Sequence, residues 1–146
     1  MASSVLGDAQ LPLFAIGAFF GILPDFDLVL SPIWPRAHRS AGSHSLIAAA
    51  AIAAAWYAAL VFVLEPYGVL VLGSAAEASA AVAFGAAFLH AAEDSLTHQG
   101  CRLMYPLSRR RWRGPVRYDD IASNAILSLA SITIIWLSVG TGAWGA

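Results

Sequence analysis

The chain has 146 residues, of which 59% are hydrophobic and only 12% are charged. An ordinary soluble domain carries about a quarter charged residues, so this composition excludes a typical water-soluble globule. The formal net charge is -1, and all eight basic residues are arginines in two short stretches, which excludes a uniformly basic nucleic-acid-binding protein. The single cysteine, Cys101, excludes a disulfide framework and a cysteine-rich zinc module.

Four apolar stretches are long enough to cross the roughly 30 Å hydrocarbon layer of a membrane as helices. Backbone amides in lipid must pair within their own segment, and these run lengths suit helices rather than barrel strands. The sequence therefore predicts one all-α domain over residues 1–146, an integral membrane bundle of about four transmembrane helices. The expected spans are residues 4–24, 45–64, 69–92 and 121–140.

Arginine is confined to the loops that follow the first and third spans. Loops 25–44 and 98–120 hold every arginine, whereas the two termini and the 65–68 hairpin hold none. Positively charged loops remain in the cytoplasm, so we expect both arginine loops inside and both termini outside the inner membrane. A secretory signal peptide is a poor alternative for residues 1–24, which lack a positively charged start.

The histidines and their neighbouring acids gather at the expected cytoplasmic end of the spans. At about 100° per residue, one stripe of the third helix collects four polar side chains: His90, Asp94, Thr97 and His98. An imidazole and a carboxylate one turn apart can reach the same divalent ion. Glu93 lies at the edge of this stripe and could serve as an outer ligand or as a partner of one.

The first loop supplies a second polar cluster. Asp25 and Asp27 follow the first span, where the helix is expected to end and both carboxylates can turn toward one point. His38 and His44 lie further along this loop, and Ser43 is a suitable N-cap for the second span. Nitrogen and oxygen ligands without thiolate predict a divalent metal, with zinc favoured and manganese or iron as alternatives.

A metal ion shared by the two clusters is one of two interpretations. It requires the carboxylates of Asp25 and Asp94 to lie within roughly 6 Å of each other, given metal-ligand bonds near 2 Å. The other interpretation is a buried hydrogen-bonded network between helices, in which Asp25 or Asp27 caps a helix.

Other polar residues near the clusters have a structural and a functional interpretation, apart from Cys101. The stretch 108–117 is either a topogenic signal among anionic lipid headgroups or the source of an arginine that clamps a substrate phosphate. For the clamp, Arg39 in the first loop is the preferred candidate. Asp119 and Asn124 either close the site from the fourth span or balance the arginine charges. Cys101 has no partner and is expected to be an inert interfacial thiol.

The motifs resemble those of the YdjM-like family of predicted membrane-bound metal-dependent hydrolases. The matching segments, within residues 21–106, are Leu23-Pro24-Asp25-Phe26-Asp27, His38-Arg39, His44-Ser45, the HxxxDxLTxxG pattern from His90 to Gly100, and Tyr105-Pro106. The resemblance implies a metal centre formed by Asp25, Asp27, His38, His44, His90 and Asp94. A remote likeness of the family to zinc-dependent phospholipase C implies phosphoester hydrolysis at a multinuclear zinc site. Many members carry a histidine early in the first helix, and its absence from residues 1–24 implies a smaller ligand set.

Together these observations predict a membrane-embedded metal-dependent hydrolase with its site at the cytoplasmic interface, acting on a phosphoester or lipid-borne substrate. One or two zinc-like ions are expected, with Glu93 or His98 as proton shuttle, Arg39 as clamp and Thr97 orienting a ligand. The alternative is a non-catalytic membrane subunit with a structural metal or polar site. A transporter fits less well, because only Glu77 lies deep within a span. The expected partners are membrane lipids, an anionic or lipid substrate and a protein within the membrane, but no nucleic acid.

Overall fold

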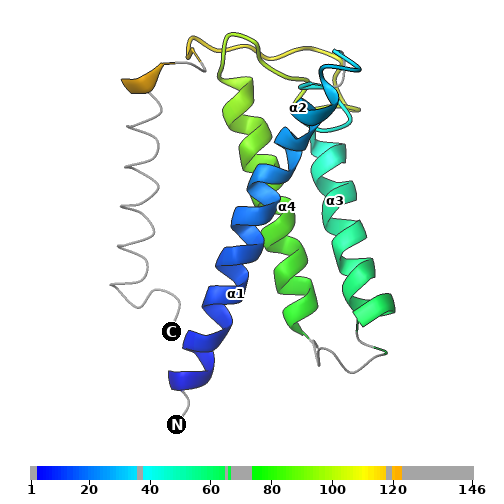
Figure 1. The fold of residues 1–146 in the computed structure, drawn as a ribbon, viewed down its shortest axis with the longest axis vertical. Coiled ribbons are helices and arrows are strands. Elements are labelled where there is room, and N and C mark those ends of the chain that lie inside the picture. Colours follow the sequence, from blue (N-terminus) through cyan, green and yellow to red (C-terminus); the bar gives the residue numbers. More distant parts are fainter. Residues whose placement is uncertain (1–2, 36–37, 65, 67–73, 118–119, 123–146) are drawn as a thin grey trace.

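The computed structural model describes residues 3–35, 38–64, 66, 74–117 and 120–122. Within them the backbone forms helices and no strand, which confirms the prediction of an all-α protein. Three long helices run side by side (Figure 1), namely α1 (Ser3–Ile22), α3 (Leu46–Ala58) and α4 (Ser74–Ser95). The fourth expected span lies outside the described residues apart from 121–122.

Two helical stretches in the described part of the chain are long and apolar enough to cross a membrane, Pro12–Leu30 and Leu46–Leu64. The first joins the end of α1 to a 3-10 turn, η1 (Leu23–Phe26), and a short helix, α2 (Asp27–Leu30). The second joins α3 to a π-helical turn, η2 (Ala59–Leu64). The count of four transmembrane helices therefore stays a prediction.

The central helix is α4, which packs against both α1 and α3. Its buried face consists of small side chains, including Ala83, Ala87 and Ala91. Many large apolar side chains lie on the outside instead, with Val29 70% and Phe62 75% exposed, although Phe20 and Leu60 are buried. Helices in lipid gain little from burying apolar groups, so small residues at their contacts and large ones outside are typical of membrane bundles.

The GxxxG pattern in α1 lies against α4. A Cβ atom on Gly17 would stand 3.3 Å from Cγ1 of Val82, and one on Gly21 would stand 4.0 Å from Cβ of Ala86. The two glycines therefore let the backbone of α1 approach α4 closely. This contact aligns the end of α1 with the last turns of α4.

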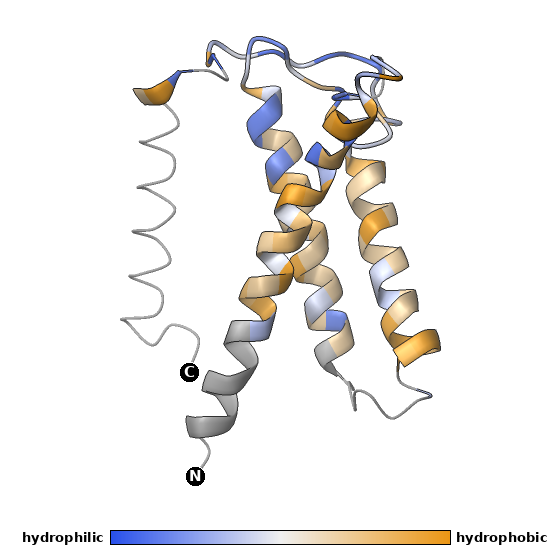
Figure 2. Cartoon of the chain, in the orientation of Figure 1, coloured by the Kyte–Doolittle hydropathy of each residue, from blue (hydrophilic) through white to orange (hydrophobic). Residues whose placement is uncertain are grey.

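The polar ends of the three helices meet at one end of the bundle, where hydrophilic residues gather (Figure 2). The loop after α4 covers the first turn of α3, because the amide of Leu46 donates to the carbonyl of Leu103 at 2.7 Å. A free helix N-terminus leaves amides without partners, and this loop satisfies one of them.

The arginine-rich segment 108–117, which we call the arginine strap, is held against the residues that follow α4. The amide of Val116 donates to the carbonyl of Leu96 at 3.1 Å, and the amide of Trp112 donates to that of Cys101 at 2.8 Å. A side chain at Gly114 would overlap the carbonyl of Leu96. The strap therefore lies at the same end of the bundle as the polar helix ends.

Candidate metal centre

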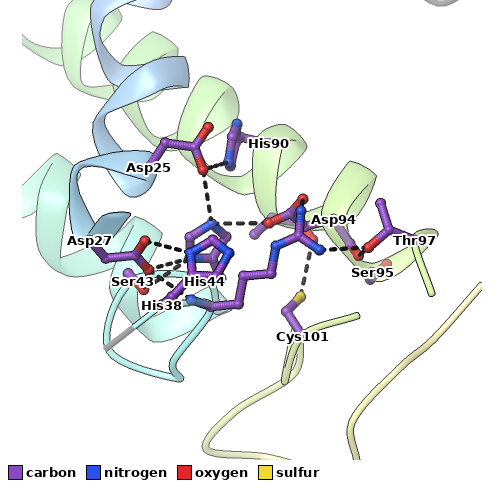
Figure 3. A network of polar contacts seen from close by, with 12 residues as sticks. Asp25, Asp27, His38, Ser43, His44, His90, Asp94, Ser95, Thr97 and Cys101 are labelled. Carbon is purple, nitrogen blue, oxygen red and sulfur yellow. Dashed lines mark hydrogen bonds and ion pairs between the residues drawn. The ribbon is translucent and has the colours of Figure 1, made fainter. Parts of the chain in front are cut away.

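Four potential metal ligands come together from three separate segments of the chain (Figure 3). Asp25 belongs to η1, His44 precedes α3, and His90 and Asp94 lie one turn apart near the end of α4. One ligand atom from each of these residues lies within 4.8 Å of the other three. We call this group the quartet; it satisfies the condition that the Asp25 and Asp94 carboxylates be close enough to share an ion.

The spacing within the quartet suits a tetrahedral ion. His90 Nε2 lies 3.2 Å from Asp25 Oδ1, and His44 Nε2 lies 3.1 Å from Asp94 Oδ2 and 3.7 Å from Asp25 Oδ1. Two ligand atoms bound to one tetrahedral zinc ion at about 2 Å are about 3.3 Å apart. These three distances bracket that value, and the ligand atoms of the whole quartet lie within 4.8 Å of one another.

Three buried atoms of the quartet, His44 Nε2, His90 Nε2 and Asp94 Oδ2, make no well-aligned hydrogen bond, although each lies 3.1–3.2 Å from another quartet atom. Buried polar atoms without partners are rare because each costs free energy. A divalent cation placed among these three atoms would satisfy all of them together. The two imidazoles and two carboxylates, with no thiolate, form a donor set that suits zinc, manganese or iron.

The quartet is more accessible on one side than on the other. The His44 side chain is fully buried, whereas the side chains of His90 and Asp25 are 19% and 41% exposed. A catalytic metal site needs an open position beside its protein ligands. Four protein ligands would fill a tetrahedral sphere, so water or substrate would have to reach the ion as a fifth ligand, from the side that carries Asp25 and His90.

Asp27 and His38 lie outside the quartet, behind the ring of His44. Asp27 Oδ2 is 3.3 Å from His44 Nδ1, and Asp27 Oδ1 is 3.0 Å from His38 Nδ1. The expectation that both carboxylates of the first loop turn toward one point is therefore wrong. The chain does not leave its helix after Pro24 but continues through a 3-10 turn, where residues two apart point in different directions.

Ser43 has a role that sequence analysis missed. Its hydroxyl donates to Asp27 Oδ2 at 2.6 Å and lies 2.9 Å from His44 Nδ1. The predicted N-cap role of Ser43 is wrong, since the hydroxyl of Ser45 caps α3 by accepting from the amide of Ala48. The position of Ser43 beside a histidine was the only available signal, and it did not distinguish the two roles.

Arg39 joins the two halves of the site. Its NH2 group is 2.8 Å from Asp94 Oδ1, its NH1 group donates to Thr97 Oγ1 at 2.8 Å, and its backbone amide donates to Asp27 Oδ2 at 2.9 Å. Its φ of 52° lies in the left-handed region that non-glycine residues seldom adopt. Both terminal nitrogens of the proposed substrate clamp are thus bonded within the protein, and Thr97 holds the guanidinium in place.

The charge of Asp94 is favoured by its surroundings. Burial opposes ionisation, but the neighbouring His44 and the guanidinium of Arg39 together lower the pKa of Asp94 below its ordinary value of 3.8. The group is therefore a carboxylate at neutral pH, which is the form that binds a cation.

Two proposed proton shuttles are exposed rather than part of the quartet. Glu93 lies on the exposed face of α4, and His98 lies beyond the helix end at Ser95. The helical projection that put His98 on the ligand stripe is wrong, because the chain leaves the helix and the amide of His98 donates to the carbonyl of Val116 at 2.8 Å. Thr97, by contrast, is buried and accepts a hydrogen bond from Arg39.

Of three other residues singled out in the sequence, only Cys101 lies within the described part of the chain. Cys101 is fully buried, with its thiol donating to the carbonyl of Ala91 at 3.2 Å. Asp119 and Asn124 lie outside the described residues.

The motif resemblance is supported by comparison with known families. The family described as YdjM inner membrane protein matches residues 1–145. Comparison with curated proteins gives no match, and neither does comparison with solved structures. The family match and the two apolar helical stretches agree on a membrane location. The chain belongs to the YdjM inner membrane protein family.

Proposed function

We propose that the chain is a membrane-embedded metal-dependent hydrolase whose site lies at the cytoplasmic end of the bundle. The observation that carries the proposal is the quartet, whose ligand atoms lie within 4.8 Å of one another and include three buried atoms that make no well-aligned hydrogen bond. A divalent ion held there would act as a Lewis acid on a substrate oxygen and on water.

The residues of the site divide into ligands and supports. Asp25, His44, His90 and Asp94 would hold the ion, and the exposure of Asp25 leaves a side for substrate to enter. Asp27 lies against the opposite nitrogen of His44, the arrangement in which a carboxylate fixes the orientation and tautomer of a metal-binding imidazole.

Glu93 is the proton shuttle in this proposal. It lies two helical turns beyond Ala86, which faces Gly21 of α1, so it is on the flank of α4 toward the segment that carries Asp25. Its exposure allows it to exchange protons with solvent. His98 has no comparable support, because it lies beyond the helix.

The proposed substrate is a phosphoester, on a lipid or a similarly anionic molecule. The arginine strap exposes Arg109, Arg110 and Arg113 at the same end of the bundle as the quartet, and Trp112 beside them is 49% exposed. Cationic and aromatic side chains together suit the headgroup region of a membrane, where lipid phosphates lie.

Purified protein in detergent, assayed on bis(p-nitrophenyl) phosphate and on phospholipid micelles, tests the proposal. We expect turnover that a chelator removes, that zinc restores and that His44→Ala abolishes. Glu93→Gln should keep the metal and lose turnover by about 100-fold or more, the contribution of a general base. A protein that binds metal but hydrolyses neither substrate would instead support a non-catalytic membrane subunit.

A further inference from the structure

We infer that the site holds a single divalent ion rather than the pair or trio found in multinuclear centres. The inference rests on the proposed metal site and concerns how many cations its residues can accept. It follows from two properties of the described residues: how the carboxylate oxygens of Asp27 and Asp94 are already engaged, and how much charge is left to neutralise.

The carboxylate of Asp94 cannot bridge two metal ions. Oδ2 faces the quartet, whereas Oδ1 is bound by the NH2 group of Arg39 at 2.8 Å. Paired metal ions in enzymes lie about 3.5–4 Å apart, so a shared carboxylate must present both oxygens to them. Here the second oxygen of Asp94 already faces a cation that belongs to the protein.

Arg39 is a fixed cation and not a mobile one. Its side chain is only 10% exposed, and Thr97 and the backbone bond to Asp27 hold it from two other directions. A guanidinium does not lose its proton in proteins, so its positive charge is permanent. It therefore stands where a second metal ion would otherwise lie beside Asp94.

Asp27 has no oxygen available for a second ion either. Its carboxylate accepts from the Ser43 hydroxyl and the Arg39 amide, and it faces Nδ1 of both His38 and His44. Three of these groups contact Oδ2 and His38 Nδ1 contacts Oδ1, so both oxygens already have a partner within the protein.

The charges of the contacting residues match one divalent ion. Asp25, Asp27 and Asp94 carry three negative charges and Arg39 carries one positive charge, which leaves two negative charges when the histidines are neutral. One divalent ion neutralises that remainder. A second ion would leave two uncompensated positive charges in a largely buried site, which is strongly unfavourable.

Metal stoichiometry measured on the full chain in detergent tests this inference. The protein is incubated with excess zinc, freed of unbound metal and analysed for zinc per chain by mass spectrometry. A parallel sample loaded with manganese is examined by electron paramagnetic resonance. We expect one zinc per chain and the spectrum of an isolated manganese ion. Two tightly held ions, or a coupled manganese pair, would overturn the inference while leaving the metal site itself intact.

No bound metal in a folded protein would overturn both the inference and the proposed function. The measured metal content therefore distinguishes failure of the inference alone, with two ions bound, from failure of the proposed function, with none bound.

Single substitutions test the number of bound metal ions independently. Asp25→Asn and His90→Gln should each reduce bound zinc from one to nearly none, whereas in a dinuclear site one ion would remain. Asp27→Asn should keep one ion at saturation but weaken its binding by about 10–100-fold, as loss of a ligand-orienting partner does. Glu77→Gln, an exposed acid at the opposite end of α4, is the matched control and should leave binding unchanged. Circular dichroism of each variant separates lost binding from lost folding.

Discussion

His44 connects the two halves of the polar network through the two nitrogens of one ring. Nε2 faces Asp94 at 3.1 Å, while Nδ1 lies 3.3 Å from Asp27 Oδ2. Because Asp27 can only accept, His44 donates from Nδ1 on that side, and Nε2 is the nitrogen that a metal ion could bind. A divalent ion between Nε2 and the carboxylates of Asp25 and Asp94 would therefore bind a ring that is already anchored on Asp27.

Cys101 gives a prediction at the residue scale that rests mainly on the burial of its thiol. Burial and, to a smaller extent, the charge of Asp94 raise the pKa of the Cys101 thiol from 9.0 to about 11, despite opposing effects of Arg111 and Arg39. Below pH 9 this shift lowers the thiolate fraction by about 100-fold, and the thiolate is the reactive form. We expect iodoacetamide at pH 8 to modify Cys101 in folded protein at least about 100-fold more slowly than in detergent-unfolded protein. Equal rates, followed by mass spectrometry, would contradict the buried thiol.

The same thiol predicts a decline in stability at high pH. Above pH 9 the unfolded chain releases the thiol proton, whereas the folded chain retains it until about pH 11. The unfolded state therefore gains favourable deprotonation over this interval, and the free energy of unfolding falls as pH rises through it. Thermal unfolding of the native chain and of Cys101→Ser should diverge between these pH values. Parallel profiles would show that the thiol titrates normally.

At the scale of secondary-structure elements, two glycines allow the arginine strap to pack closely against the residues at the end of α4. Gly100 has a φ of 61°, and a Cβ there would overlap the backbone of Trp112; one at Gly114 would overlap Leu96. We expect Gly100→Ala and Gly114→Ala each to lower the free energy of unfolding by about 1–3 kcal/mol, as overpacking does. Gly85→Ala is the matched control, since nothing lies within 4 Å of its Cβ. Melting temperatures in detergent measure the difference, and unchanged values for both strap variants would show that the strap is loosely held.

Helical periodicity predicted the part of the site that lies within one regular helix. His90 and Asp94 share a stripe because α4 runs without interruption through both. The projection failed at His98, because residue types alone did not show that the helix ends at Ser95. The strap could not be predicted for a similar reason: it is attached through backbone amides and carbonyls, which every residue carries.

Motif spacing predicted which segments meet but not how each side chain faces. Asp25 and Asp27 were correctly expected near the histidines, and they lie on opposite sides of His44. A loop and a 3-10 turn are both compatible with a proline before two acids, and only the turn separates the carboxylates in this way. The dual role of Arg39 also escaped prediction, because its left-handed backbone has no sequence signature in a non-glycine residue.

At the scale of the whole molecule, the proposed orientation in the membrane can be tested with single cysteines in a Cys101→Ser background. Leu107 is 77% exposed beside the arginine strap, and Pro66 is exposed after η2, at the opposite end from the start of α3. If the strap is cytoplasmic, a membrane-impermeant maleimide should label Leu107→Cys only in inside-out vesicles and Pro66→Cys only in intact cells. The reverse pattern would contradict the orientation.

The origin of the quartet in three segments has a consequence for how the protein matures. Asp25, His44 and the pair on α4 are contributed in chain order, each from a different part of the bundle. No single hairpin of the nascent polypeptide contains a complete coordination sphere, so tight uptake of an ion must await docking of all three segments. Once acquired, the ion would bind only the assembled form and shift the equilibrium toward it. Loading would then follow the docking of the three segments and would stabilise the assembled bundle.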